Sequence, residues 1–162
     1  MSLRIGNGYD VHRFGAGDHL VLGGVTIPFE RGIVAHSDGD VVIHSLCDAM
    51  FGAAGMGDIG HHFPDSDPEH KDADSREFLR LAVGLLKAQR LSLVNADITV
   101  VAEAPRLAPF IPTMINNLAA DTRSKPGQIN IKATTTEGLG FSGRGEGVAC
   151  YAVALLSWES SA

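Results

Sequence analysis

Hydrophobic and polar residues recur along the chain with two different periods, and these periods predict its strands and helices. A period of two, or a short continuous apolar run, is typical of strands. It marks six segments: residues 3–14, 20–22, 25–27, 95–103, 128–136 and 147–159. Apolar residues at helical spacing mark three more: about residues 38–54, a segment that begins at Asp74, and residues 110–121. The Gly-Gly pair between the second and third strand segments predicts a hairpin.

Capping residues set the expected starts of the helices. Ser37 and Asp38 are good N-cap residues for the first helix, and Asp74 with Glu77 forms a capping box for the second. Pro112 is tolerated in the third helix only within its first turn. We expect the second helix to bury one apolar face, made of Phe78, Leu81, Ala82, Leu85 and Leu86.

The order of these segments predicts the architecture. Strands that alternate with helices favour an α+β fold with a mixed sheet and helices packed on it. No linker, repeat or low-complexity tract divides the sequence, so we expect one domain over residues 1–162. Residues 147–159 are almost continuously apolar, which predicts a central strand covered on both faces. Residues 55–68 are rich in Gly, Asp, His and Pro, which predicts a long loop without a packed element.

Composition narrows the classes of function. The chain has 162 residues, 44% of them hydrophobic, and 13 basic against 19 acidic residues give a net charge of -6. This balance disfavours a broad nucleic-acid surface, so local groups must bind any anionic ligand. Cys47 and Cys150 lie in apolar runs without paired spacing, which indicates buried thiols in a reducing compartment. No targeting segment or membrane-length apolar run occurs, so we expect a soluble, cytoplasmic protein.

Two segments carry residues suited to a metal ion. Asp40, His44 and Asp48 recur every four residues on the otherwise apolar first helix, so they lie along one stripe. Asp10 and His12 are two apart in a strand, which places both side chains on one face, roughly 6.6 Å apart along the chain. Two histidines and one carboxylate with an open position are typical of catalytic zinc.

Within this hypothesis, His44 is the third ligand and Asp40 or Asp48 orients an imidazole. The alternative is purely structural. In that case Asp40 caps the helix, His44 is a satisfied core histidine and Asp48 is solvated. The helix taken alone favours this alternative, and the pair at Asp10 and His12 favours the metal.

Residues 132–147, KATTTEGLGFSGRGEG, form the second dense polar region. Lys132 and Arg144 supply positive charge, the threonines supply hydroxyl and N–H groups, and the glycines allow close backbone approach, which together suit a diphosphate. Glu137 fits beside phosphates when a divalent cation lies between them, and a carboxylate oxygen suits Mg²⁺. The alternative is a threonine-rich strand end followed by a glycine-rich turn.

Six motifs together resemble the family of 2-C-methyl-D-erythritol 2,4-cyclodiphosphate synthases of the non-mevalonate isoprenoid pathway, in order over roughly residues 4–157. They are DVH (residues 10–12), AHSDGDVVIH (35–44), GDIGHHFPDSDP (57–68), DSRE (74–77), ITVVAEAPRLAPFI (98–111) and INIKATTTEGLGFSGRGEG (129–147). The resemblance implies a two-layer sandwich with helices on one face of the sheet. It also implies a homotrimer whose sheets face the threefold axis and whose active sites lie between protomers.

The activity implied by the resemblance is that of a phosphorus-oxygen lyase. It cyclises 4-diphosphocytidyl-2-C-methyl-D-erythritol 2-phosphate and releases CMP, using zinc and either magnesium or manganese. Two cations offset the repulsion between phosphates and align the attack, so we assign no general base.

The resemblance also implies roles for individual residues. The zinc ligands are Asp10, His12 and His44, and Glu137 binds magnesium or manganese. Catalytic roles fall to His36, Asp48 and Thr135. Substrate-binding roles fall to Ser37, Asp58, Gly60, Phe63, Asp65, Ala102, Ala104, Pro105, Arg106, Ala108, Lys132, Thr134, Thr135, Phe141 and Arg144.

A central channel in the family holds an isoprenoid diphosphate, and the positions that match its lining are Tyr9, Phe141, Arg144 and Glu146. Trimer packing and a salt bridge in a glycine turn explain these residues equally well. Two other classes of function stay open for the whole chain. One is a metal-dependent hydrolase of a nucleoside diphosphate derivative, and the other is a non-catalytic trimeric module that binds isoprenoid diphosphate.

Overall fold

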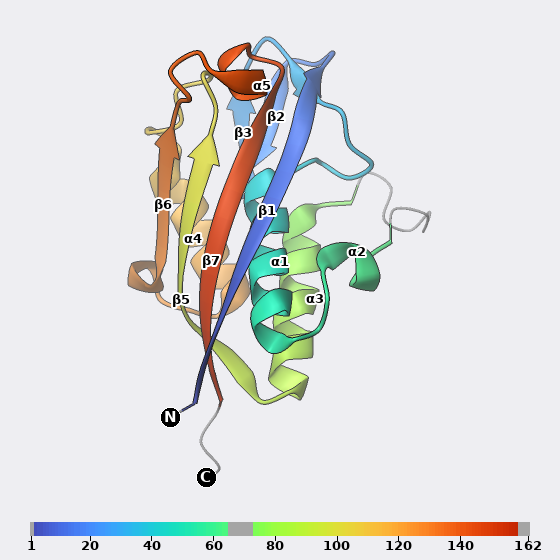
Figure 1. Cartoon of the computed structure of the whole chain (residues 1–162), viewed down its shortest axis with the longest axis vertical. Coiled ribbons are helices and arrows are strands. Elements are labelled where there is room, and N and C mark those ends of the chain that lie inside the picture. The colour runs from blue at the N-terminus through green and yellow to red at the C-terminus, as the bar shows by residue number, and fades with distance from the viewer. Residues whose placement is uncertain (1, 65–72, 159–162) are drawn as a thin grey trace.

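The computed structural model describes residues 2–64 and 73–158 and contains two sheets with helices packed beside them (Figure 1). The larger sheet has five strands in the order β4-β1-β7-β5-β6, and β2 and β3 form a hairpin. The strands are β1 (Leu3–Gly15), β2 (His19–Leu22), β3 (Val25–Pro28), β4 (Gly32–Ile33), β5 (Leu91–Val101), β6 (Ile129–Thr134) and β7 (Gly147–Trp158). The α-helices are α1 (Val41–Ala54), α2 (Ile59–His62), α3 (Ser75–Ala88), α4 (Ile111–Thr122) and α5 (Gly140–Gly143).

The five-stranded sheet is mixed, as the sequence predicts. β7 pairs antiparallel with β1 and with β5, whereas β5 and β6 run parallel. The most apolar strand therefore lies at the centre of the sheet, as predicted. The first and last strands are neighbours, with Leu3 opposite Ser157 and Arg13 opposite Gly147.

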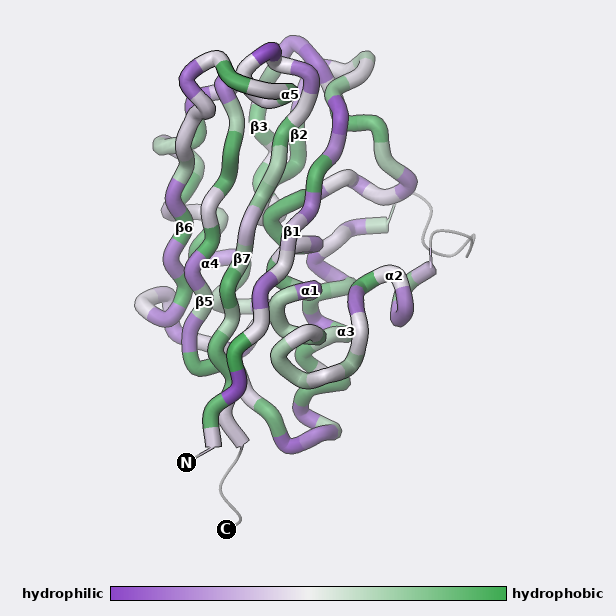
Figure 2. The backbone as a smooth tube through the Cα atoms, viewed as in Figure 1, coloured by the Kyte–Doolittle hydropathy of each residue, from purple (hydrophilic) through white to green (hydrophobic). Residues whose placement is uncertain are grey.

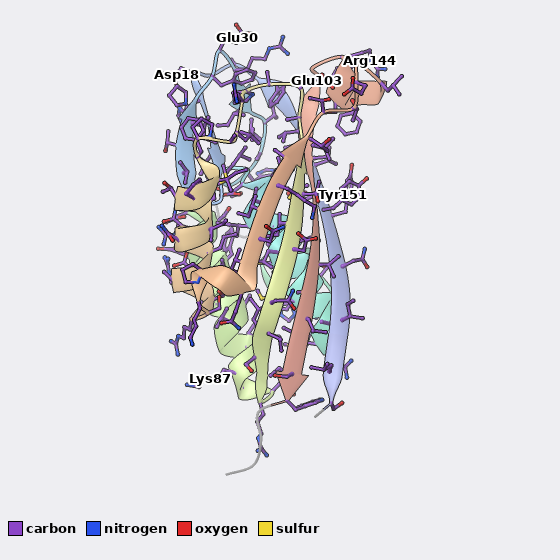
Figure 3. The ribbon with its side chains drawn as sticks, turned by 90° about the vertical axis from the view of Figure 1, so that its left-hand side faces the viewer. Asp18, Glu30, Lys87, Glu103, Arg144 and Tyr151 are labelled. Carbon is purple, nitrogen blue, oxygen red and sulfur yellow. The ribbon has the colours of Figure 1, made fainter. Side chains whose placement is uncertain are left out.

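The helices α1, α3 and α4 cover one face of this sheet, which confirms the expected α+β class with helices on one face (Figure 1). The residues of β7 alternate between buried and more exposed from Cys150 to Ser157, and Tyr151 is 53% exposed. Its ring lies 4.8 Å from that of Tyr9, on the side away from the helices (Figure 3). The prediction that β7 is covered on both faces is therefore wrong for the described residues, because α1, α3 and α4 all lie on the other side of the sheet.

Apolar side chains reach this helix-free face from β1 as well. Figure 2 shows hydrophobic stretches on the central strands as well as on the helices behind them. Four large apolar side chains of the face are at least 40% exposed in addition to Tyr9 and Tyr151: Leu3, Ile5, Val11 and Val153. None of the helices in the described part of the chain has the length and apolar character needed to span a bilayer.

Two glycines of β1 let α1 lie directly against the sheet. A Cβ atom at Gly8 would lie 2.0 Å from the carbonyl oxygen of Ser45, and one at Gly6 would lie 2.2 Å from that of Ala49. Only residues without a side chain fit at these two positions. This close contact brings Asp10, two residues after Gly8, beside the helix that carries His44.

Several predicted helix details need correction. The first helix is capped by Asp40 instead of Ser37 or Asp38, since its carboxylate accepts hydrogen bonds from the N–H groups of the first turn. Leu81 and Leu85 are exposed, because the buried face of α3 is rotated toward Leu79. The segment expected to be a loop contains the short helix α2. Asp74 caps α3 as predicted, through the N–H of Arg76, but no described hydrogen bond from the Glu77 side chain completes the predicted capping box. Pro112 lies in the first turn of α4, as predicted.

Candidate metal centre and two ligand pockets

Three predicted ligands come together between β1 and α1. Asp10 and His12 point from the same face of β1 toward the helix layer, and His44 reaches them from α1. The Asp10 Oδ2 atom lies 3.0 Å from His44 Nδ1 and 3.3 Å from His12 Nε2. One ligand atom from each residue lies within 4.8 Å of the other two.

These atoms fit a divalent cation. Tetrahedral zinc with nitrogen and oxygen ligands near 2.0–2.1 Å requires neighbouring ligand atoms to lie roughly 3.3 Å apart, as two of the three pairs do. The His12 Nε2 atom is buried and has no hydrogen-bond partner among the described residues. A buried nitrogen aimed at a carboxylate without a hydrogen bond is readily explained as a metal ligand.

The charges of the cluster are coupled. Burial by itself raises the pKa of Asp10, but the close contacts with His12 and His44 and the positive charge of these rings outweigh burial and hold that pKa well below its ordinary value. Burial lowers the pKa of His44, but the hydrogen bond and charge of Asp10 overcome this and raise it above 6.5. The carboxylate is therefore ready to bind a cation, whereas His44 must release a proton first.

Asp40 does not orient an imidazole, contrary to the prediction. Its carboxylate accepts hydrogen bonds from the backbone N–H groups of Gly23 and Gly24, at 2.9 and 2.7 Å, as well as from the first turn of α1. It is fully buried, and burial raises its pKa to about 6. Asp40 therefore joins the β2–β3 hairpin to the start of α1, as in the structural alternative.

No described hydrogen bond joins Asp48 to His44, although Asp48 lies one turn further along α1. Its Oδ1 atom accepts a 2.7 Å hydrogen bond from the N–H of Ile59. Burial raises the pKa of this half-buried carboxyl group, and the same hydrogen bond opposes the shift. Asp48 thus holds the start of α2, and no described hydrogen bond gives it the predicted orienting role.

The structure gives His44 a different partner, Ser75 at the first position of α3. Its Oγ atom lies 2.8 Å from His44 Nε2 and donates a hydrogen bond to the carboxylate of Asp38. Ser75 is fully buried. The motif DSRE contains Ser75, but its sequence separation from His44 gives no sign of this contact.

A pocket of about 200 Å³ opens above the three ligands. It is lined by the predicted residues His36, Ser37, Gly60 and Phe63, together with three that were not predicted, Ala35, Ile59 and Phe78. Phe63 stacks on Phe78 with ring centroids 5.0 Å apart, which forms one apolar wall. Asp58 does not line this pocket but caps α2 through the N–H of His61. Asp65 lies outside the described residues.

A second pocket, of about 320 Å³, lies where β5 and β6 end. Its walls include the predicted residues Ala102, Pro105, Arg106, Ala108, Thr134 and Thr135. Glu103 and Leu107, within the same segment, complete it together with Ala133, which was not predicted. Ala104 is exposed and does not line it. The two pockets share no residue.

Lys132 does not line the second pocket, although it was expected near a diphosphate. Its side chain points to the helix-free face of the sheet, where Nζ lies 2.5 Å from both carboxylate oxygens of Asp97. The two residues stand on adjacent parallel strands, and both are about half exposed. Lys132 lies on the same face of β6 as Thr134, but its ammonium group is paired with Asp97 instead of lining the pocket.

Glu137 lies in the turn after β6 with a positive φ of 54°, and its carboxylate accepts a hydrogen bond from Thr135 Oγ1 at 3.3 Å. It is not part of the cluster around Asp10 in the described chain. The turn is held by Glu103, which accepts hydrogen bonds from Thr136 N and Oγ1 at 2.9 and 3.1 Å. The backbone hydrogen bond from Thr136 lowers the pKa of Glu103.

Phe141 and Arg144 lie just beyond this turn, in and after the short helix α5. Arg144 pairs with Glu146 at 2.7 Å, and both side chains are exposed. Figure 3 places Arg144 and Glu103 at the same end of the molecule. The salt bridge is the one expected under the structural alternative for these residues, and no described contact gives them a ligand-binding role.

Comparisons with known proteins place these features in context. A family model described as the YgbB family matches residues 3–157. The 2-C-methyl-D-erythritol 2,4-cyclodiphosphate synthase of Cellvibrio japonicus is 57% identical over 156 residues, which cover 96% of this chain and 98% of that protein.

Solved structures agree with the sequence comparison. The bifunctional IspDF of Campylobacter jejuni superposes with a TM-score of 0.94 at 45% identity, covering 98% of this chain and 43% of that longer chain. The IspF of Plasmodium falciparum, in a complex with CDP, superposes with a TM-score of 0.86 at 34% identity, covering 98% of both chains.

Proposed function

Because the chain belongs to the YgbB family and matches cyclodiphosphate synthases along nearly its whole length, we propose that it forms 2-C-methyl-D-erythritol 2,4-cyclodiphosphate. The substrate is 4-diphosphocytidyl-2-C-methyl-D-erythritol 2-phosphate, and the second product is CMP. The observation that carries the proposal is the convergence of Asp10, His12 and His44 at one end of a pocket. With a cation bound, that arrangement would present it to a phosphate that enters the pocket.

The reaction requires alignment more than acid or base catalysis. An oxygen of the substrate's 2-phosphate attacks the β-phosphorus, the bond from that phosphorus to the bridging oxygen breaks, and CMP leaves with the electron pair. No water is consumed, which makes the enzyme a phosphorus-oxygen lyase. The apolar wall of Phe63 and Phe78 supports this reaction because it limits the access of water to the phosphate.

Asp10, His12 and His44 would hold zinc, and Glu137 would hold magnesium or manganese in the completed site. Bound cations supply Lewis-acid chemistry and a template for the phosphate oxygens. His36 and Ser37 line the first pocket, where they bind the erythritol phosphate. Ala102, Pro105 and Arg106 line the second pocket, where backbone groups bind cytosine.

A homotrimer explains how one substrate reaches both pockets. In one chain, β1 carries the metal ligands and β6 leads to Glu137, and these strands are three positions apart in the sheet. Three strand spacings amount to roughly 14 Å, and the pockets share no residue. Packing of neighbouring chains through the exposed apolar sheet face would join the first pocket of one protomer to the second pocket of its neighbour. An isoprenoid diphosphate fits the central channel of such a trimer.

The experiment that tests the reaction is product analysis by ³¹P NMR. The metal-loaded protein and a His44→Ala variant are incubated with the diphosphocytidyl substrate. We expect the coupled doublets of a cyclic diphosphate and stoichiometric CMP, both lost in the variant. Linear phosphates with CMP would support the hydrolase instead, and incorporation of ¹⁸O from labelled water would identify its reaction.

The non-catalytic alternative predicts a different result. A module that only binds isoprenoid diphosphate would produce no cyclic product with metals present. It would also retain that binding in Asp10→Ala and Glu137→Ala variants. Equilibrium binding of an isoprenoid diphosphate to these variants, measured beside turnover, separates the two functions.

A further inference from the structure

Ser75 connects the metal ligand His44 to a carboxylate on a third segment of the chain. Its Oγ atom lies 2.8 Å from His44 Nε2, on the side of the ring opposite to Asp10. The same hydroxyl donates to the carboxylate of Asp38, and the backbone N–H of Ser75 donates to the other oxygen of that carboxylate at 3.0 Å. Three elements therefore meet at one fully buried hydroxyl group.

The direction of these hydrogen bonds fixes one proton of the imidazole. A serine hydroxyl has a single hydrogen to donate, and an ionised carboxylate can only accept. Since Ser75 donates to Asp38, its oxygen must accept from His44, so the proton lies on Nε2. The hydroxyl of Ser37 is farther from Nε2, at 3.4 Å, and accepts from the N–H of Gly39.

We propose that Ser75, supported by Asp38, is a positioning residue that holds the Nε2–H of His44 and thereby aims Nδ1 at the metal. The inference rests on the proposed function, because that function requires an ion at Asp10, His12 and His44. Histidine ligands commonly donate their second N–H to an outer partner that orients the ring. Here the partner is a neutral hydroxyl with a carboxylate behind it.

The hydroxyl can be tested separately from the anchoring of α3. A Ser75→Ala variant loses both hydroxyl contacts but keeps the backbone hydrogen bond to Asp38, which ties the start of α3 to the loop before α1. Ser75→Thr keeps the hydroxyl group. Ser45→Ala is the matched control, because Ser45 is also fully buried beside His44 but donates to the carbonyl oxygen of Val42.

Zinc affinity is measured by competition with a chelator, without substrate. We expect Ser75→Ala to bind zinc ~10- to 100-fold more weakly, the usual effect of removing an outer partner of a metal ligand. Ser75→Thr should restore most of the affinity, and Ser45→Ala should match the wild type. Affinity of Ser75→Ala within about twofold of Ser45→Ala would overturn the proposal.

The proton itself is observed in ¹⁵N–¹H spectra of the zinc-loaded protein with labelled histidine. We expect a His44 Nε2–H signal protected from solvent exchange in the wild type and in Ser45→Ala, and lost by exchange in Ser75→Ala. A wild-type spectrum with the proton on Nδ1, or with no zinc at His44, would overturn the inference even if Ser75→Ala failed to fold. Turnover is measured separately, so zinc binding that depends on Ser75 without cyclic product would contradict only the proposed function.

Discussion

The carboxylate of Asp10 lies 3.0 Å from Nδ1 of His44, although 34 residues separate them in the sequence. A strand supplies one partner and a helix the other, and the contact depends on how closely these two elements pack. The same hydrogen bond raises the pKa of His44 against the effect of burial. The packing of β1 on α1 and the charge of Asp10 can therefore be changed separately, and the effects can be measured as protein stability and as the pKa of His44.

Asp10→Asn should lower the pKa of His44, because burial then acts without the opposing carboxylate. The metal-free variant is titrated by NMR of the His44 ring. Zinc affinity should fall by at least ~100-fold, more than the loss of an outer partner causes. Asp18→Asn is the control, since Asp18 pairs with the exposed His19 at 2.6 Å. An unchanged His44 titration in Asp10→Asn would contradict the coupling.

Gly8→Ala should destabilise the protein by about 3 kcal/mol or more, because its methyl group would overlap the backbone of Ser45. Urea unfolding measures the change. Gly84→Ala is the matched control in α3, where an added methyl group meets no atom within 4 Å. It should stabilise the protein by ~0.5–1 kcal/mol through helix propensity. Equal stabilities of the two variants would show that α1 does not depend on the close contact with β1.

Asp40 should make the free energy of unfolding depend on pH. Burial raises its pKa from 3.8 to about 6 in the folded chain, while backbone N–H groups of Gly24 and Gly23 oppose the shift. The folded state therefore binds this proton more tightly than the unfolded state does. The resulting stabilisation is fully present below about pH 4 and is lost as the pH rises through about 6.

Comparison with Asp40→Asn isolates this effect. The free energy of unfolding of the wild type, minus that of the variant, should fall by ~1–3 kcal/mol between pH 4 and pH 7. Urea unfolding at several pH values measures the difference. A difference that stays constant with pH would mean that the pKa of Asp40 is the same in the folded and unfolded states.

The two cysteines should be unreactive in the folded protein. Burial raises the pKa of Cys150 to about 12 and raises that of Cys47 further above its ordinary value. Thiol reagents attack the thiolate, so neither residue should react at pH 8. Both should react once the chain is unfolded in guanidinium chloride. Rapid labelling of either cysteine without denaturant would indicate local opening of α1 or β7.

The strands and the mixed sheet could be predicted because their apolar spacing is local. Ile98 and Val100, for example, lie two residues apart on the same face of β5, and both are buried. The pairing of Asp10 and His12 was predictable for the same reason, since a period of two places them on one face. Their role as zinc ligands stays a prediction.

Contacts between distant segments could not be predicted. The cap of α1 is Asp40 instead of Asp38 because the β2–β3 hairpin presents two additional N–H donors to it. Leu81 and Leu85 have the same helical spacing as buried residues, and only the orientation of α3 on its neighbours exposes them. Ser75 reaches His44 because α3 begins beside α1, which no local pattern records.

The pairing of the first and last strands also determines where additional sequence can be attached. Leu3 lies opposite Ser157, so the described chain begins and ends at the same end of the two paired strands, the lower end in Figure 1. Glu103 and Arg144 lie at the opposite end of the molecule (Figure 3). A purification tag or a fused domain at either terminus would therefore extend away from the second pocket, whichever end carries it.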